Sequence, residues 1–530
     1  MRRDEMLIQL EEPIEWDIII IGGGATGLGA AVDAASRGYK TLLLEQHDFA
    51  KGTSSRSTKL VHGGVRYLAQ GNIKLVKEAL RERGLLLKNA PHVTNNISFV
   101  MPSYRWWDKY YYGIGLKIYD LLAGKLGLGK TAILSKKSII NYLPTISAKG
   151  MNGGVMYHDG QFDDSRLAIN LAQTAVEQGA TVINYCKVIG LRKGIKKING
   201  LFVQDVLNGK EYELKCKVVI NATGVFTDNI LQMDDKERHE LVSPSQGIHL
   251  VMDKKFFPGD IAMMIPKTDD GRVLFAVPWH DKVVVGTTDT PVDEYSLEPV
   301  AYEDEIDFIM THINRYLNVD IKRSDVKSVY VGLRPLVNMK GQKNTALLNR
   351  DHTIVVSPSG LVSITGGKWT TYRKMAKDVV TNAVFAAKLK KSDCVTDELK
   401  IHGYTPHPGP PGYPGQVLLE EREKHLHYYG SDADKIKKLQ NDNPSLKEKI
   451  IEGLSYTKAE IIWAVRYEMA MTVEDVLARR TRLLFLDAKA AVKAAPVVAA
   501  LMAVEMNKDD VWQQQQVKEF NEVAGNYILT

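Results

Sequence analysis

The sequence predicts an α/β protein in three parts: an N-terminal domain with a parallel sheet, a mixed α+β domain and an α-helical C-terminal domain. Three observations lead to this fold class. A strand-like run, a glycine-rich turn, a helical segment and a second strand follow one another between residues 16 and 45. Strand-like and helix-like segments then alternate to about residue 385. A proline- and glycine-rich stretch separates them from a charged, helix-like end.

The length and composition exclude several classes of protein. A chain of 530 residues is too long for one hydrophobic core, so two or three domains are expected. No run of about 18 apolar residues is present, and acidic residues interrupt the first 12, so neither a membrane span nor a secretion signal is predicted. Cys186, Cys216 and Cys394 have no short spacing, which indicates no disulfide framework or zinc site and favours the cytoplasm. The net charge of +6 is too small to indicate nucleic acid or another partner.

The first glycine-rich turn carries a dinucleotide-binding pattern. The elements around it are a strand at 16–21, a helix at 25–37 and a strand at 41–45. Gly22, Gly24 and Gly27 would allow a tight turn, close approach of a pyrophosphate to the backbone, and close packing of helix on strand. Glu45 follows about 20 residues on, where its carboxylate can accept hydrogen bonds from ribose hydroxyls. A glycine-rich turn in an unrelated α/β protein is the alternative.

Three further segments are expected to contact the same cofactor. They are a hydroxyl-rich loop after the second strand, a small-residue turn after a strand at 218–221, and a glycine turn near residue 366. The first glycine-rich turn and the two later turns together indicate one long cofactor. The predicted contacts are Thr53, Ser54, Ser55, Ala222, Gly224, Gly366, Gly367, Lys368 and Thr370.

The predicted division of the chain follows the order of elements and one change of composition. A helix at 165–178 and a strand at 181–189 belong to the α/β part, whereas helices at 457–471 and 488–506 follow the proline-rich residues 402–415. We expect a discontinuous cofactor domain of residues 1–95, 150–240 and 341–390. Residues 96–149 and 241–340 are expected to form the substrate-binding domain, 391–415 a linker, and 416–530 the helical domain.

Five segments together resemble one enzyme family. They are residues 22–27, 53–55, 59–68, 331–336 and 366–373, of which His-Gly-Gly-x-Arg-Tyr-Leu and Gly-x-Arg-Pro-Leu are the most selective. The chain closely resembles the FAD-dependent glycerol-3-phosphate dehydrogenases, and the similarity continues into residues 473–487. Val225, Phe226 and Arg56 depart from the family's usual residues. The resemblance implies an FAD-binding Rossmann-like domain of the glutathione-reductase and D-amino-acid-oxidase type.

The resemblance also implies a reaction. The enzyme would oxidise sn-glycerol 3-phosphate to dihydroxyacetone phosphate, with transfer of the C2 hydride to FAD. The residue types support this, because a phosphate dianion requires several cationic donors, and Arg66, Arg334 and Lys368 each lie beside a glycine-rich or proline-fixed turn. Each of them taken alone could instead be a surface cation.

Removal of the hydroxyl proton requires a base near neutral pKa. His249 matches the family's active-site histidine, although a histidine in an apolar strand is usually structural. His62, which precedes two glycines, is the second candidate. Tyr67 is expected to orient substrate or phosphate. Residues 278–279 and 286–289 resemble the pair of strands that walls the substrate pocket.

The electron acceptor is expected to be a membrane quinone, reached by peripheral attachment to the inner face of the cytoplasmic membrane. Residues 104–122 combine twelve aromatic or aliphatic residues with Arg105, Lys109 and Lys117, which suits the headgroup boundary. The alternative is a buried packing segment. Family resemblance favours the membrane, because these dehydrogenases are respiratory enzymes, and an insertion typical of the related oxidases, which use oxygen, is absent. Whether the protein is a homodimer stays open.

Three other functions are alternatives to this one. An amino-acid or glycine oxidase would need one arginine and no strong base, and a flavin-holding binding or RNA-modification scaffold would not oxidise an alcohol. A nicotinamide-dependent dehydrogenase would purify without yellow colour. No metal site is predicted, because His425 and His427 lie in a highly charged helix without the spacing of metal ligands.

Overall fold

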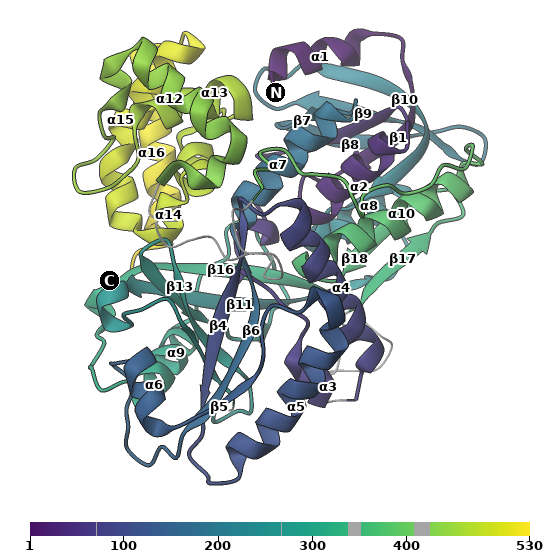
Figure 1. Ribbon diagram of the computed structural model, residues 1–530. Helices are drawn as coiled ribbons and strands as arrows, with labels where there is room; N and C mark the ends of the chain where they lie inside the picture. Colours follow the sequence, from purple (N-terminus) through teal and green to yellow (C-terminus); the bar gives the residue numbers. More distant parts are fainter. Residues whose placement is uncertain (70, 267, 338–350, 407–424, 530) are drawn as a thin grey trace.

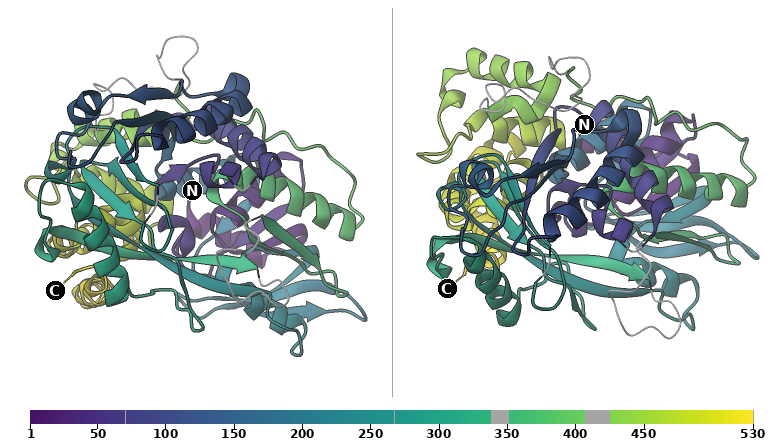
Figure 2. Two further views of the ribbon diagram at one scale, coloured as in Figure 1. Left: turned by 90° about the horizontal axis from the view of Figure 1, so that it is seen from below. Right: turned by 60° about the horizontal axis from the view of Figure 1, so that its bottom comes forward.

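The computed structural model describes residues 1–69, 71–266, 268–337, 351–406 and 425–529, apart from the side chains of Arg66 and Ala69. Two β-sheets and a cluster of C-terminal helices make up this part of the chain (Figure 1). Both views of Figure 2 place the C-terminal helices on one side of the molecule and the helices of the first sheet on the other.

The first sheet contains eight strands within the described residues, in the order β17-β18-β10-β1-β2-β7, with β9 and β8 following β10. Its strands are β1 (Glu15–Ile21), β2 (Thr41–Leu44), β7 (Thr181–Ile183), β8 (Cys186–Lys193), β9 (Ile198–Asp205), β10 (Glu211–Asn221), β17 (His352–Val356) and β18 (Val362–Gly366). Strand β1 runs parallel to both β2 and β10. Ile18 and Ile20 pack against helices on one face, and Ile19 and Ile21 pack against the β8–β10 layer on the other. A strand covered on both faces has to be apolar at nearly every position, which explains the isoleucine run.

Helices α2 (Ala25–Ser36), α7 (Asp164–Glu177) and α10 (Tyr372–Ala386) cover the first face of this sheet (Figure 1). The predicted elements around the glycine turn agree with these bounds to within one residue. The strand predicted at 181–189 is wrong as a single element, because Tyr185 has a left-handed backbone conformation with φ 55°. That residue separates β7, which pairs with β2, from β8, which pairs with β9.

The second sheet is mostly antiparallel and contains ten strands among the described residues. Its strands are β3 (Leu60–Val61), β4 (Thr94–Pro102), β5 (Ala132–Leu134), β6 (Gly154–Phe162), β11 (Val242–Asp253), β12 (Ala262–Ile265), β13 (Leu274–Trp279), β14 (Lys282–Gly286), β15 (Thr290–Pro291) and β16 (Val326–Val337). Helices α6 (Lys136–Tyr142) and α9 (Glu303–Tyr316) pack on it through one shared apolar core. Strands β3 and β6 belong to this sheet, whereas the predicted division placed both with the cofactor domain. Strand β6 pairs with β4 on one side and with β3 on the other, and neither pairing could be read from local pattern.

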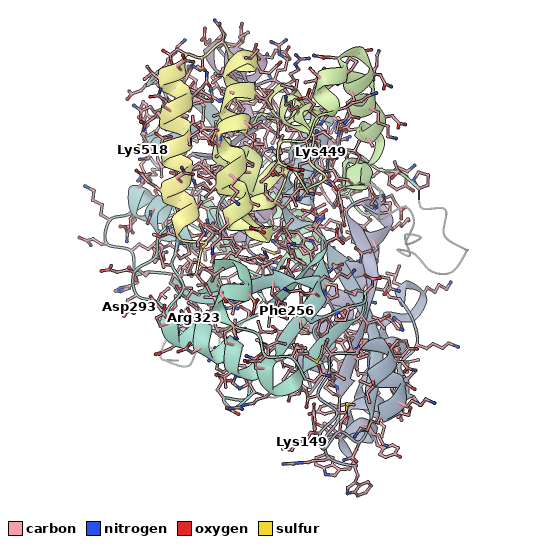
Figure 3. The ribbon with its side chains drawn as sticks, turned by 90° about the vertical axis from the view of Figure 1, so that its left-hand side faces the viewer. Lys149, Phe256, Asp293, Arg323, Lys449 and Lys518 are labelled. Carbon is pink, nitrogen blue, oxygen red and sulfur yellow. The ribbon has the colours of Figure 1, made fainter. Side chains whose placement is uncertain are left out.

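The remaining helices are those not yet described, and they include the helices of the C-terminal part of the chain. They are α1 (Arg3–Glu11), α3 (Val65–Ala69), α4 (Ile73–Asn89), α5 (Asp108–Ala123), α8 (Thr227–Asp234), α12 (Ala433–Asp442), α13 (Lys458–Glu468), α14 (Leu483–Leu486), α15 (Ala488–Met506) and α16 (Asp510–Gly525). The C-terminal helices share a core with Val251 and Tyr330 of the second sheet, so they pack on it directly. Figure 3 shows Lys518 of α16 at one end of the molecule and Lys149, beyond α6, at the other. The predicted linker lies partly outside the described residues, from position 407 onward.

Candidate active site

Two cavities meet where the two sheets adjoin. The first, of about 440 Å³, lies at the carboxyl ends of β1, β2 and β10, and the second, of about 340 Å³, lies against the second sheet. Both are lined by Thr53, Pro335 and residues 366–369. The arrangement therefore allows a long molecule in the first cavity to meet a small one in the second.

The first glycine turn has the geometry that a pyrophosphate site requires. Gly22 has φ 110°, a conformation that favours glycine, and a Cβ on Gly27 would lie 1.8 Å from the Gly22 carbonyl oxygen. Gly24 precedes the first residue of α2, so the amide groups of the first helical turn lie at the cavity. Gly22 and Gly24 line the cavity, whereas Gly27 brings helix and strand together.

Glu45 lies at the end of β2 and also lines the first cavity. Its carboxylate accepts hydrogen bonds from the amides of Gly23 (2.6 Å) and His47 (2.8 Å). Burial raises the pKa of Glu45, and these two amide donors oppose the rise. The carboxylate is thus fixed where it could accept hydrogen bonds from ribose hydroxyls.

The hydroxyl-rich loop contributes only some of its predicted contacts to this cavity. Thr53 lines both cavities and donates to the Leu333 carbonyl (2.6 Å), and Ser54 accepts from the amide of Ala25 (2.9 Å). Ser55 does not line either cavity. It is fully buried, and its carbonyl accepts a hydrogen bond from Lys59 Nζ (2.7 Å).

The two later turns lie at the same cavity. Ala222 and Gly224 line it beside the first glycine turn, and Gly366, Gly367 and Lys368 line its junction with the second cavity. Thr370, also predicted as a cofactor contact, lines the second cavity but not the first, and it accepts a hydrogen bond from the amide of His62 (3.2 Å). The first cavity extends from residues 186–188 past all three turns, and this length and its amide lining fit FAD.

His249 lies on β11 in the wall of the second cavity. Its Nε2 is 2.8 Å from Thr58 Oγ1, and its ring stacks on Tyr330 with 4.7 Å between centroids. Burial lowers the pKa of His249 well below 6.5, and the charges of Arg334 and Lys59 lower it further. The imidazole is therefore neutral at pH 7 and in the form that can accept a proton, but its pKa lies below the near-neutral value expected of the base.

Cationic side chains lie in the same cavity. Arg334 on β16 donates to Thr288 O (2.8 Å) and Thr287 Oγ1 (3.1 Å), and its side chain is 25% exposed. Lys368 Nζ lies 3.9 Å from the centre of the Tyr67 ring, and both residues line the cavity. The side chain of Arg66, the third predicted cation, lies outside the described part of the structure.

The remaining predicted residues are only partly brought together. His62 lines the second cavity, as do residues 287–289, whereas Pro278 and Trp279 do not. Trp279 instead lies over Lys59, with 4.9 Å between Nζ and the ring centre. The side chains of β13 alternate in direction, and those two positions lie beyond the segment that lines the cavity.

Sequence reasoning missed several residues of the second cavity. Thr58 lies in the same run of hydroxyl residues as Thr53, Ser54 and Ser55, so its own hydroxyl group was the available signal. Phe99, Tyr157, Met264 and Phe275 form an apolar wall from four different strands, and no local pattern marks them. Only their shared sheet brings them together.

Among the described residues, no group of three or more His, Cys, Asp or Glu side chains is arranged to hold a metal ion. His425 Nε2 lies 2.8 Å from Glu460 Oε1, so this histidine makes a structural contact within the C-terminal part of the chain.

The chain is similar to known proteins over nearly its whole length. A family model described as FAD dependent oxidoreductase matches residues 17–373, and one described as the C-terminal domain of alpha-glycerophosphate oxidase matches residues 362–515. The mitochondrial glycerol-3-phosphate dehydrogenase of Homo sapiens is 40% identical over 97% of this chain and 74% of its own length. The corresponding Arabidopsis thaliana enzyme is 39% identical over 96% of this chain and 85% of its own length. The structure of the glycerol-3-phosphate dehydrogenase from Bacillus halodurans complexed with FAD matches with a TM-score of 0.80 and 29% identity, over 99% of this chain and 98% of that one.

Proposed function

Because the chain belongs to the FAD-dependent glycerol-3-phosphate dehydrogenases, we propose that the second cavity binds sn-glycerol 3-phosphate against the flavin end of the first. The chain is thus an FAD-dependent oxidoreductase that forms dihydroxyacetone phosphate. The observation that carries the assignment of the site is the junction of the two cavities at residues 366–369, beside His249 and Arg334. FAD, when bound, supplies the acceptor for the C2 hydride.

We assign the binding of the substrate phosphate to the cationic residues of the cavity. Arg334 is held by Gln246 O, Thr287 Oγ1 and Thr288 O, so its guanidinium is positioned before substrate arrives. A positioned guanidinium loses little side-chain entropy when it binds a dianion. Lys368 and Arg66 are proposed as the further cationic contacts, and Tyr67 as the ring that supports Lys368.

We assign the removal of the C2 hydroxyl proton to His249. Its lowered pKa keeps it neutral, and its stacking on Tyr330 and contact with Thr58 fix the ring plane. His62 lines the same cavity and stays the second candidate. An amino-acid oxidase would not need a neutral base beside two cations, so the cavity favours the alcohol phosphate.

The test of this assignment is anaerobic bleaching of the flavin. The purified yellow protein is mixed with glycerol 3-phosphate, with glycerol, or with glycine, and absorbance near the flavin maximum is followed. We expect rapid bleaching by glycerol 3-phosphate alone. Bleaching by glycine would instead support an amino-acid oxidase, and a colourless protein that FAD cannot reconstitute would contradict the cofactor assignment.

We also propose a membrane quinone as the electron acceptor, reached by peripheral attachment through α5. The exposed apolar residues of α5 and the loop before it are Trp106, Trp107, Tyr110, Tyr111, Ile114, Ile118 and Leu121. They recur at helical spacing, whereas Leu116 and Tyr119 on the opposite face are buried. Arg105 and Lys117, both exposed, supply positive charge at the same surface.

This surface lies at the end of the molecule opposite the C-terminal helices (Figure 1). No helix in the described ranges has the length and apolar character needed to cross a bilayer. An exposed face of this kind is suited to lie in the headgroup region. The proposed location is the inner face of the cytoplasmic membrane, although the animal and plant relatives are named as mitochondrial enzymes.

Vesicle flotation tests the attachment. We expect the protein to float with vesicles that contain anionic lipid, and the double substitution Trp106→Ser and Leu121→Ser to abolish flotation. The matched control is Phe385→Ser, since Phe385 is 86% exposed on α10. Flotation that survives the double substitution would contradict the proposed surface. Turnover with oxygen but not with a soluble quinone analogue would contradict the proposed acceptor.

A further inference from the structure

One loop, residues 48–59, borders both cavities of the site. Lys51, Thr53 and Ser54 line the cofactor cavity, and Ser57 and Thr58 line the substrate cavity. Thr58 also contacts His249. A displacement of this loop would therefore change the cofactor site and the base together.

The start of the loop is bound by the C-terminal part of the chain. The Asp48 carboxylate accepts hydrogen bonds from Arg479 Nε (2.5 Å) and from Arg480 Nη1 (2.7 Å) and Nη2 (2.9 Å), and all three side chains are buried. Burial alone would raise the pKa of Asp48, but the two guanidinium groups lower it to about 2. These buried ion pairs hold Asp48 in place, because breaking them would leave a buried charge without a partner.

The middle of the loop is bound by a second set of charges. Lys51 Nζ lies 2.6 Å from Glu474 Oε2, and Glu474 also accepts from Arg479 (2.8 Å). Arg56 lies 2.7 Å from Glu298, which in turn accepts from Tyr527 near the C-terminus (3.2 Å). Arg56, which departs from the family's usual small residue, thus has a partner that ties the loop to the end of the chain.

The end of the loop is bound in the same way. Lys59 is fully buried, donates to Asp164 (2.8 Å), and lies 5.2 Å from the centre of the Phe485 ring. Arg482 pairs with Asp163, the neighbour of Asp164, at 3.0 Å. Residues 474–485 therefore contact or support the loop at its start, middle and end.

We infer that the C-terminal segment 474–485 is a positioning element of the active site. It holds loop 48–59 in the position that would bring a bound flavin next to His249. The inference rests on the proposed function of the two cavities. Glu474, Arg479 and Arg480 act through Asp48 and Lys51, since none of these three lines either cavity. The C-terminal helical domain is thereby part of the catalytic unit rather than an appended domain.

The experiment compares Glu474→Ala with Glu474→Gln, which keeps an acceptor oxygen, and with the control Glu505→Ala. Glu505 pairs with Arg466 within the C-terminal domain (2.6 Å) and lies outside both cavity linings. For each holoenzyme, three quantities are measured: the rate of flavin release, the visible circular dichroism of the flavin, and the rate of flavin reduction at saturating glycerol 3-phosphate.

We expect Glu474→Ala to release flavin at least tenfold faster, to change the visible circular dichroism, and to slow flavin reduction with little change in KM. Glu474→Gln should recover part of each loss, and Glu505→Ala should match the wild type. Flavin release and dichroism equal to those of Glu505→Ala would overturn the inference. These two readouts need no substrate, so failure of the wild type to be bleached by glycerol 3-phosphate would contradict the proposed function without deciding the role of the segment.

Discussion

The two cavities of the site are built by different means. The cofactor cavity is lined largely by glycines, small residues and backbone amides at turns that directly follow parallel strands. The substrate cavity is lined by side chains from strands far apart in the sequence, including His249 on β11, Arg334 on β16 and Phe99 on β4. The difference shows that a short sequence motif can specify the first cavity, whereas only the pairing of the second sheet specifies the other.

The largest expected effect is on the cofactor cavity. Gly27→Val should abolish FAD binding and with it all activity, because the added Cβ would lie 1.8 Å from the Gly22 carbonyl oxygen. Flavin content of the purified protein measures this. The control Gly525→Ala lies at the end of α16, with open space around it and no left-handed backbone conformation, and it should retain flavin. Normal flavin in Gly27→Val would show that the close packing of α2 on β1 is not required.

His249→Ala should have the next largest effect, confined to the substrate cavity. Loss of a general base typically costs about 10² to 10⁴ in rate. Stopped-flow reduction of the flavin at saturating substrate measures the loss, and flavin content should not change. His62→Ala is the comparison in the same cavity, and a collapse in that variant with normal reduction in His249→Ala would exchange the two roles.

Arg334→Ala should raise KM for glycerol 3-phosphate, because a charge-assisted contact of about 1.5–3 kcal/mol is lost, or roughly 10- to 100-fold. The effect on unphosphorylated glycerol should be small. Equal effects on both substrates would show that Arg334 does not contact the phosphate.

The same variant should also change the pH dependence of flavin reduction. The positive charge of Arg334 helps to lower the pKa of His249, after burial, so its removal should raise that pKa. The acid limb of the reduction rate in the wild type is expected below pH 6.5, and in Arg334→Ala it should move to higher pH. An unchanged limb would argue that His249 is not the titrating base.

The smallest effect is expected from Thr58→Val, which keeps the side-chain shape and removes the contact with His249 Nε2. One hydrogen bond contributes about 0.5–1.5 kcal/mol, so flavin reduction should slow by roughly two- to tenfold. Thr353→Val on β17 is a control outside both cavity linings. A loss as large as that of His249→Ala would indicate that Thr58 itself takes part in proton transfer.

The sequence by itself determined the first β–α–β unit and most of the cofactor cavity. Gly22, Gly24, Gly27 and Glu45 lie within 24 residues of one another, and the steric needs of a tight turn and a helix N-terminus leave few alternatives. The comparisons confirm FAD and the family that the motifs indicated. Ser55 shows the limit of this reasoning, because a loop can turn one of three neighbouring hydroxyls away from the cavity.

Tertiary structure decided everything that depends on long-range pairing. Strands β3 and β6 join the second sheet, and the apolar wall of the substrate cavity is assembled from four strands of that sheet. The burial of Arg479 and Arg480 against Asp48, more than 400 positions away in the chain, has no local signal either. Side-chain periodicity reports which face of an element is buried, but it carries no information about which distant element covers that face.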